Sequence, residues 1–349
     1  MKQTDKTDIK SLKYADLAAF FASNGFPKYK TEQIFAWLHK GASSTEEMTD
    51  ISKTDREKLN AIAYITTPVI EKKLISKLDG TVKYLWRLSE NEYVESVVME
   101  YKHGLSICVS TQLGCKMGCV FCASTVTGFQ RDLTAAEILD QIIFASKDIG
   151  KRISNVVLMG IGEPLNNFEN VMTFLENVNN EKGLNIGYRH ISLSTCGIGE
   201  KIEQLLEKNI PLTLSISLHA PNDEIRNRIM PVNKVTNTEN LLIICEKYAK
   251  ITKRRISIEY ILIEGMNDKR ENAEELANRL RQIRLNTKCH VNLIPVNVIN
   301  EKGFNPPSNN AIKVFESELI KNGINATTRR TLGADIQASC GQLRAKSTE

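Results

Sequence analysis

From residue 115 onward, short apolar runs alternate with longer amphipathic stretches, and this alternation restricts the fold more than any other feature of the sequence. Apolar runs that lie between helical stretches are typical of parallel strands buried on both faces of a sheet. Five or six such β/α units suit an open α/β barrel, although the period alone would also fit a doubly wound sheet. The expected strands are 156–159, 191–194, 212–217, 256–261 and 290–294, and the expected helices include 135–149, 240–250 and 271–283.

The part of the chain before residue 115 has a different character. We expect a small helical accessory domain, which could dock RNA or serve only as a packing appendage, followed by a β extension. Its patterns predict helices at 14–21, 31–38 and 49–62, and strands at 83–88, 94–99 and 106–110. The expected parts of the whole chain are the accessory domain at 1–78, the extension at 79–100, the core at 101–333 and a C-terminal segment at 334–349.

Length and composition exclude several classes of protein. The 349 residues are enough for one large α/β domain and a smaller appendage. The formal net charge of +5 is a weak indication of an anionic partner. We see neither a signal peptide nor the roughly 18 consecutive apolar residues of a membrane helix. Eight cysteines are too few for a disulfide scaffold, so we expect a cytoplasmic protein that does not bind membranes.

Three cysteines, Cys115, Cys119 and Cys122, follow the spacing Cys-x-x-x-Cys-x-x-Cys. Thiolates at this spacing can bind three irons of a [4Fe-4S] cluster and leave the fourth iron open to a small molecule. Gly114 and the glycine between the first two cysteines favour a loop here. A zinc site is the alternative from spacing alone, with Cys108 as a conceivable fourth ligand.

The cysteine spacing resembles the signature of the radical S-adenosylmethionine (SAM) superfamily. The resemblance implies a partial (β/α)6 barrel that holds an iron–sulfur cluster. It also implies that SAM binds the open iron, where one electron cleaves it to methionine and a 5′-deoxyadenosyl radical. In such an enzyme the protein positions the cofactor and excludes water.

Polar groups follow several of the expected strands. Gly162 and Glu163 come after the strand that ends at Met159, and this carboxylate could hold the amino group of SAM. Ser194 and the run 217–219 end two further strands and could bind ribose or carboxylate oxygens. Ordinary turn or structural roles explain the same residues, and for Asn297, after the last strong strand, the local sequence favours a plain turn residue.

Cys340 is the other cysteine with an unusual context. It lies between Ser339 and Gly341, after a basic strand that ends with Arg329 and Arg330. Neighbouring cations favour the nucleophilic thiolate of an exposed cysteine. A small buried turn residue explains the local pattern equally well.

Taken together, these motifs resemble the RlmN family of RNA adenine C2-methyltransferases over nearly the whole chain. The resemblance implies methylation of an adenosine in the peptidyl-transferase centre of 23S rRNA and of the adenosine just 3′ of some tRNA anticodons. We also expect a monomer and an electron donor such as flavodoxin. The matching stretches are 94–97, 108–115, the cysteine run to 122, 159–167, 215–224 and 338–343.

The same resemblance implies roles for individual residues. Cys340 takes a methyl group from one SAM, and a second SAM, bound at the cluster, provides the radical that activates this methyl group. The carbon radical adds to adenine C2, and Glu95 accepts the C2 proton. Cys108 then releases the product by forming a transient disulfide with Cys340. The implied SAM contacts are Gly162, Glu163, Ser194, Ser217, Leu218, His219 and Asn297.

Two other functions compete with this interpretation. A Cfr-type enzyme would use the same machinery to methylate adenine at C8 and would give antibiotic resistance. Pro164 favours the RlmN type, because Cfr-type sequences tend to carry alanine at that position. A zinc-bound RNA-binding protein without catalysis would leave Glu163 and Cys340 unexplained.

Overall fold

The computed structural model describes residues 6–299 and 301–343, and a ten-stranded sheet forms its centre. The strand order across the sheet is β14-β13-β12-β11-β10-β9-β6-β5-β4-β3. Neighbours from β6 to β14 pair in parallel, and β3 to β6 pair antiparallel. The parallel strands are β6 (Gly104–Cys108), β9 (Ile153–Leu158), β10 (Ile191–Thr195), β11 (Thr213–Ser217), β12 (Ile256–Leu262), β13 (Cys289–Pro295) and β14 (Ala326–Thr328).

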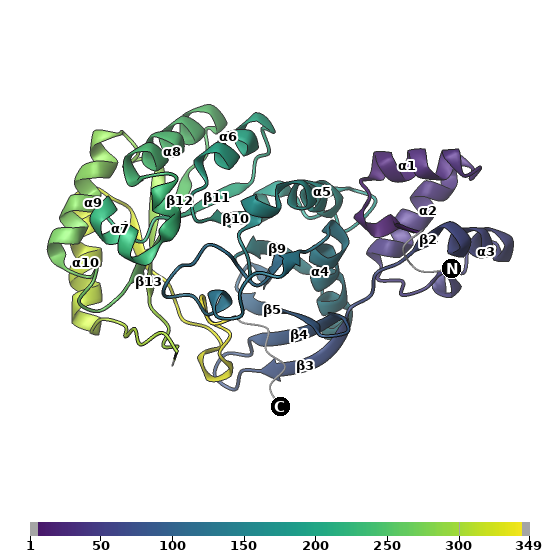
Figure 1. Cartoon of the computed structure of the whole chain (residues 1–349), viewed down its shortest axis with the longest axis horizontal. Coiled ribbons are helices and arrows are strands. Elements are labelled where there is room, and N and C mark those ends of the chain that lie inside the picture. Colours follow the sequence, from purple (N-terminus) through teal and green to yellow (C-terminus); the bar gives the residue numbers. More distant parts are fainter. Residues whose placement is uncertain (1–5, 300, 344–349) are drawn as a thin grey trace.

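The order of the parallel strands decides between the two folds that the period left open. From β6 to β13 the strands follow one another in space as they do in sequence, without the reversal that a doubly wound sheet requires. Because crossovers between parallel strands are right-handed, successive helices then fall on the same side of the sheet. Figure 1 shows these helices on the outside of the sheet: α4 (Ala135–Ile149), α5 (Phe168–Asn179), α6 (Gly199–Glu207), α8 (Thr238–Thr252), α9 (Arg270–Gln282) and α10 (Asn309–Lys321). The short helix α7 (Asp223–Ile229) packs instead against the loop that bears the three cysteines.

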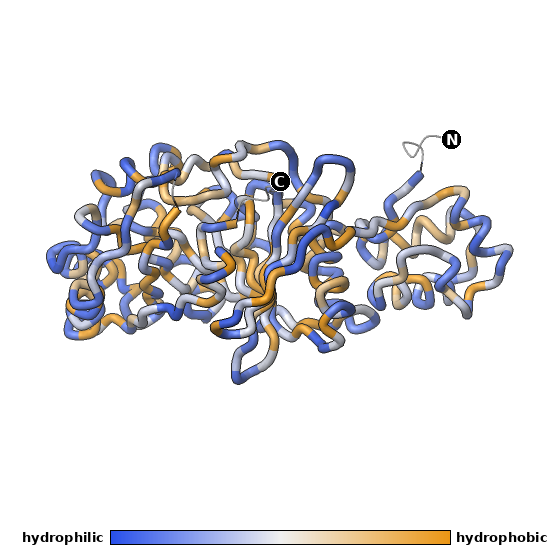
Figure 2. Tube along the Cα trace, turned by 90° about the horizontal axis from the view of Figure 1, so that it is seen from below, coloured by the Kyte–Doolittle hydropathy of each residue, from blue (hydrophilic) through white to orange (hydrophobic). Residues whose placement is uncertain are grey.

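The six expected β/α units are therefore present, and β14 adds a short parallel strand at the edge. Buried side chains such as Leu193, Leu214 and Ile258 pack between the strands and the inner faces of the helices. Figure 2 shows the hydrophobic stretches gathered along the central strands and the hydrophilic ones at the outer turns. Local signals fix the helix ends: Thr134 and Glu137 form a capping box at the start of α4, and Gly150 ends it at φ +68°.

A separate helical unit precedes the sheet and lies at one end of the molecule (Figure 1). Its helices are α1 (Tyr14–Ser23), α2 (Lys28–His39) and α3 (Lys53–Ile62), which enclose an apolar core of their own, and β1 (Thr7–Asp8) pairs with β2 (Ala63–Tyr64). A buried ion pair joins this unit to α4, since Lys10 Nζ lies 2.6 Å from Asp140 Oδ1 with both side chains almost fully enclosed.

The β extension consists of β3 (Val69–Ile75), β4 (Val82–Ser89) and β5 (Glu92–Tyr101). The last two were expected, but β3 was not, and it lies within the range 1–78 that we assigned to the helical domain. The reason is its position at the sheet edge, where its residues are mostly exposed and include charged side chains, so its sequence lacks the alternation of a half-buried strand.

Candidate active site

A cavity of about 160 Å³, called here the first cavity, opens at the carboxyl ends of the parallel strands. The thiols of Cys115, Cys119 and Cys122 form part of its wall, together with residues at the ends of β9 to β13. This is the edge at which the fold was expected to gather functional groups. The predicted SAM contacts that line the first cavity are Gly162, Glu163, Ser194, Ser217 and His219.

The three cysteines lie on a loop that is closed by a short antiparallel pairing of β7 (Gln112–Leu113) with β8 (Arg131–Asp132). Gly114 starts this loop at φ +73°, and a Cβ on it would lie 1.5 Å from the carbonyl oxygen of Gly128. Only glycine fits at such a close approach of two backbones. Gly114, which the sequence analysis took as a sign of a loop, is thus required because the backbone passes so close to Gly128.

The chemistry of the three thiols fits a soft metal centre. Burial raises the pKa of the Cys115 thiol to about 11 and also raises the pKa values of Cys119 and Cys122, and coordination to a metal would remove the thiol protons despite this burial. Within residues 6–299 and 301–343, no three His, Cys, Asp or Glu side chains are grouped around a single ion position. Thiolates that each bind a different iron of one cluster need not share such a position, so the donor set fits a cluster.

The Glu163 carboxylate is held at the wall of the first cavity by backbone amides. Its two oxygens accept hydrogen bonds from the N–H of Leu165 (3.1 Å) and of Cys196 (2.7 Å), and its own N–H donates to Gln112 Oε1 (2.9 Å). Burial raises the pKa of this carboxyl, and the backbone hydrogen bonds oppose that rise. The ends of β9 and β10 therefore fix one carboxylate in the wall of the first cavity.

The ends of β10 and β11 bring further polar groups together. Thr195 pairs with Ile216 in the register of these strands, and Ser194 Oγ lies 3.5 Å from Ser217 Oγ. His219 has the unusual φ of +60°, and its Nδ1 accepts a hydrogen bond from the N–H of Ile261 (3.0 Å), which leaves the ring proton on Nε2. Burial lowers the pKa of His219 to about 3, so the ring is a neutral donor.

Leu218 differs from its neighbours, because its side chain packs in the hydrophobic core and does not line the first cavity. Its backbone N–H donates to the carbonyl oxygen of Glu259 (3.1 Å) and ties the end of β11 to β12. Any contact of Leu218 with a ligand in this cavity would have to come from the backbone.

Arg226 is a site residue that the sequence analysis missed. Its guanidinium is fully buried and donates to the carbonyl oxygens of Cys196 (2.6 Å), Leu218 (3.0 Å) and Ser217 (3.2 Å). A single planar donor group thus joins the ends of β10 and β11 from behind the cavity. Glu259 and Arg329, which also line the first cavity, were not predicted as ligand contacts either. Their only local signal is that each lies in or just after an expected strand.

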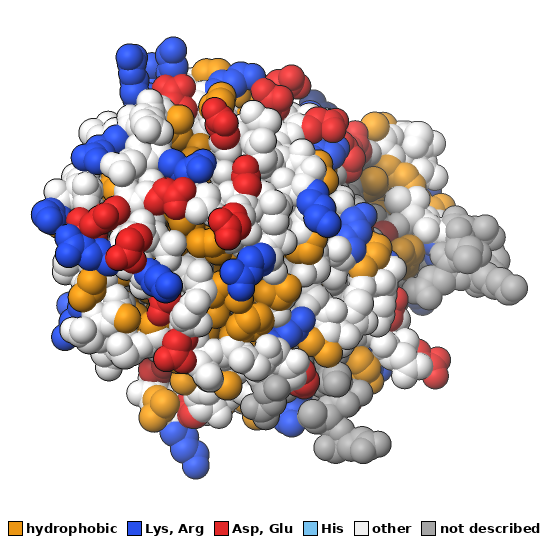
Figure 3. Space-filling model, turned by 60° about the vertical axis from the view of Figure 1, so that its left-hand side comes forward, with side chains coloured by type: hydrophobic (Ala, Val, Ile, Leu, Met, Phe, Trp, Pro, Cys, Tyr) orange, Lys and Arg blue, Asp and Glu red, His pale blue; other side chains and the backbone are white. Residues whose placement is uncertain are grey.

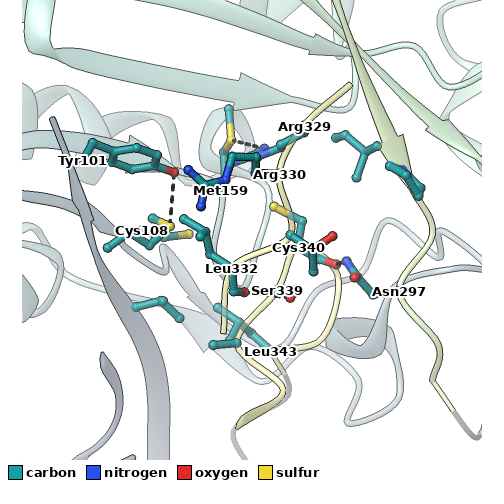
Figure 4. Close-up of a pocket in the computed structure, with 16 residues that line it drawn as sticks. Tyr101, Cys108, Met159, Asn297, Arg329, Arg330, Leu332, Ser339, Cys340 and Leu343 are labelled. Atoms are coloured by element: carbon teal, nitrogen blue, oxygen red, sulfur yellow. Dashed lines mark hydrogen bonds between the residues drawn. The ribbon is translucent and has the colours of Figure 1, made fainter. Parts of the chain in front are cut away.

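A second, smaller cavity of about 40 Å³ contains Cys108 and Cys340 in its wall (Figure 4). Cys340 lines both cavities, whereas Cys108 lines only the second. Both are free thiols. Burial and, to a smaller extent, the nearby Cys340 raise the pKa of Cys108 to about 12, and Arg329 opposes the rise. Cys340 thus shares one cavity wall with Cys115, Cys119 and Cys122 and the other with Cys108.

The loop around Cys340 is attached to both neighbours. The Asn297 amide donates to the Cys340 carbonyl oxygen (2.9 Å), and the Ala123 N–H, next to Cys122, donates to the Gly341 carbonyl oxygen (2.8 Å). Figure 4 shows Asn297 beside the Cys340 loop, and this predicted SAM contact lines the second cavity instead of the first. The strand-end position was correctly recognised, but the side chain supports the thiol-bearing loop.

Glu95 lies on β5 and lines neither cavity. Its side chain is 8% exposed, and its Oε1 lies 2.8 Å from Lys83 Nζ. The predicted proton acceptor therefore takes part in a largely buried ion pair, a partner that the sequence did not suggest.

Comparison with known proteins identifies the family. Residues 109–278 match the sequence model of the Radical SAM superfamily, and residues 7–65 match that of the ribosomal RNA large subunit methyltransferase N-terminal domain. A probable dual-specificity RNA methyltransferase RlmN from Alkaliphilus oremlandii is 49% identical over 342 residues, which cover 98% of each chain. The chain belongs to the RlmN family. A probable RlmN from Clostridium tetani is also 49% identical, over 97% of this chain and 95% of the relative.

A solved structure supports the same assignment. The crystal structure of a radical SAM methyltransferase from Sphaerobacter thermophilus matches with a TM-score of 0.92 at 38% identity, over 97% of this chain and all of the other. The predicted radical SAM fold is thus confirmed, and the protein is a radical SAM RNA methyltransferase of the RlmN type. Membership implies an iron–sulfur cluster, SAM and RNA substrates, and it excludes a zinc-bound protein without catalysis. None of the helices in the described residues is long and apolar enough to cross a membrane.

Proposed function

We propose that the enzyme methylates C2 of adenosine, in 23S rRNA and in tRNA, through a methyl group carried on the sulfur of Cys340. The observation that carries the proposal is that Cys340 lines both cavities. A methyl-carrying sulfur has to face the radical source first and a second thiol afterwards. Cys340 has the three cysteines of the first cavity on one side and Cys108 on the other.

The first cavity has the groups that a cluster and SAM require. Cys115, Cys119 and Cys122 would hold a [4Fe-4S] cluster, and the fixed Glu163 carboxylate would accept hydrogen bonds from the SAM ammonium group. Neutral His219 would donate from Nε2, and Ser194 and Ser217 would bind oxygens of the ribose or carboxylate. The backbone of Leu218 completes the proposed set in this cavity, and Asn297 would contact SAM from the wall of the second cavity. Bound there, the cluster and SAM supply the electron and the radical that activate the methyl group, with two SAM used per turnover.

The other steps belong to residues of the chain. Cys340 Sγ, as the thiolate, takes the methyl group of one SAM by displacement, and S-adenosylhomocysteine leaves. The thiolate is needed because adenine C2 lies between two ring nitrogens and is too electron-poor to attack SAM itself. After the methyl carbon has joined C2, Glu95 accepts the C2 proton. Cys108 then loses its proton and attacks the Cys340 sulfur as a thiolate, so that an S–S bond forms as the bond from that sulfur to the RNA-bound carbon breaks. The electron pair of the broken bond stays on the carbon, which takes up a proton and becomes the methyl group of the product.

This release step requires the two cysteines to approach closely, since a disulfide cannot span Cα atoms more than about 7 Å apart. The position of Cys108 and Cys340 in the wall of one small cavity supports it. An external dithiol would then return both residues to free thiols. A flavodoxin-type donor would deliver electrons to the enzyme, which we propose acts as a monomer.

The charged side chains on the surface do not single out one binding site for RNA. The face in Figure 3 carries Lys and Arg side chains interspersed with Asp and Glu, around hydrophobic side chains near its centre. This face does not form a basic stripe, and scattered lysines and arginines can still contact the phosphates of a folded RNA.

The test is a reaction with anaerobically reconstituted enzyme, reductant, SAM and an unmodified 23S rRNA fragment or tRNA, with the nucleosides read by mass spectrometry. We expect 2-methyladenosine together with 5′-deoxyadenosine. The appearance of 8-methyladenosine would assign the Cfr-type reaction instead. Deoxyadenosine without methylated RNA would refute the proposed substrates while leaving the radical chemistry in place.

A further inference from the structure

The segment that carries Cys340 is attached to the β3–β4 hairpin, which is remote from it in sequence. The Asp335 carboxylate accepts hydrogen bonds from Ser76 Oγ (2.7 Å) and from the N–H of Lys77 (2.9 Å), and the Gly333 N–H donates to Asp79 (2.9 Å). Figure 1 shows the C-terminal segment, in yellow, beside this hairpin. These contacts dock the segment on the β extension.

Lys83, on β4 of the same hairpin, makes a contact of another kind. Its ammonium lies 2.8 Å from Glu95 Oε1 and donates to the carbonyl oxygen of Gln337 (3.1 Å). The Lys83 and Glu95 side chains are 10% and 8% exposed, so each needs a charged or polar partner in place of water. An ammonium has three donors and can serve both partners at once. One cation thus joins Glu95 to the backbone of the segment that bears Cys340.

The position of Glu95 along β5 places the Lys83–Glu95 pair close to the second cavity. Side chains alternate along a strand, so Glu95 faces the same side of β5 as Val97 and Met99. Both of these line the second cavity, which contains Cys108 and Cys340. At about 3.4 Å per residue, Glu95 stands about 7 Å along the strand from the first residue of that wall.

We propose that Lys83 is a positioning residue that holds the Glu95 carboxylate in a fixed relation to the docked Cys340 segment. The ion pair with Lys83 gives the carboxylate one orientation toward the RNA-bound intermediate, and the Lys83 contact to Gln337 adds to the docking of the segment. The docking part of this inference stands on the contacts alone, whereas the effect on proton transfer rests on the proposed function. Lys83 itself touches neither cavity.

The experiment compares three variants of the full-length reconstituted enzyme. Lys83→Met removes the shared cation, and Lys83→Arg keeps it. Asp335→Asn is the matched control, because it weakens the docking contacts to Ser76 and Lys77 without touching Glu95. Hydrogen exchange of residues 333–343 reports docking, mass spectrometry reports methylation of Cys340, and single-turnover kinetics report the release of methylated RNA from its covalent adduct with Cys340.

We expect faster exchange of the segment in Lys83→Met and in Asp335→Asn. Only Lys83→Met should slow adduct release, by about 10-fold or more, with Cys340 still methylated, since general-base steps contribute factors of this order and above. Lys83→Arg should restore most of the release rate. If Lys83→Met does not fold, Lys83→Gln replaces it, because the amide keeps a donor without the charge.

Unchanged exchange in the Lys83 variant would overturn the docking role. Equal slowing of release in Lys83→Met and Asp335→Asn would overturn the link to Glu95, because docking alone would then explain both. If the unmodified enzyme makes no methylated RNA, the proposed function fails, and the exchange result still decides whether Lys83 holds the segment.

Discussion

Replacement of Gly162 by alanine tests how tightly the turn after β9 is constrained. Gly162 has a φ of +108°, and a Cβ there would lie 2.7 and 2.8 Å from Cβ and Cγ of Gln112 and 2.9 Å from its backbone nitrogen. The backbone conformation alone costs an alanine about 1–3 kcal/mol. Because the clash involves the backbone of β7, relief of the overlap costs about 1–3 kcal/mol more. Together these predict that the free energy of unfolding falls by about 2–6 kcal/mol.

The same substitution should weaken SAM binding. The Glu163 N–H donates to Gln112 Oε1 at 2.9 Å, so a displaced Gln112 moves the carboxylate that we assign to the SAM ammonium group. Urea unfolding followed by circular dichroism measures the stability loss, and equilibrium dialysis of the reconstituted enzyme measures SAM affinity.

Gly265→Ala is the control for the energetic cost of placing an alanine at a positive φ. Gly265 has a φ of +69°, and apart from its two chain neighbours no atom of the described residues lies within 4 Å of the position of its Cβ. Its replacement should cost only about 1–2 kcal/mol, the ordinary cost of the left-handed conformation. Equal losses in the two variants, with SAM affinity unchanged in Gly162→Ala, would refute the argument from close packing.

Three further predictions address the thiols, the domain junction and the response to acid. Cys108→Ala should leave cluster assembly and SAM cleavage intact and accumulate RNA attached to Cys340, as seen by mass spectrometry; free methylated product at normal turnover would contradict the resolving role. Lys10→Met leaves Asp140 buried without its cation and should cost about 3–5 kcal/mol in urea unfolding, whereas Lys10→Met combined with Asp140→Leu should recover most of it. Burial lowers the pKa of His39 from 6.5 to about 4, so the unfolded chain takes up a proton that the folded chain rejects as the pH falls below 6.5. The contribution of the neutral His39 ring to the free energy of unfolding is therefore complete above pH 6.5 and falls by up to about 3 kcal/mol toward pH 4. The urea midpoints at pH 7 and pH 5 should lie closer together in His39→Gln than in the unmodified protein.

The sequence alone determined the features that depend on near neighbours in the chain. The β/α alternation, the loop that bears the three cysteines and the polar strand ends at Glu163 and Ser194 all follow from local periodicity and turn chemistry. Strand ends of parallel units meet at one edge of a sheet, so these local signals were enough to place the first cavity. The edge strand β3 was not predicted, because a strand that is exposed on both faces lacks the alternation of apolar and polar residues by which a strand is recognised.

Only the tertiary structure decided how remote segments meet. The strand order selected the partial barrel over the doubly wound sheet, and the docking of the C-terminal segment put Cys340 between the two cavities. The fold likewise brought Lys83 to the carbonyl oxygen of Gln337, and Arg226 to the carbonyl groups behind the first cavity. Each of these contacts joins two residues that are distant in the sequence. The residues next to either one give no indication of which residue it will contact. Their geometry is set by the packing of the whole chain, since a buried charge or donor is stable only where the fold supplies its counterpart.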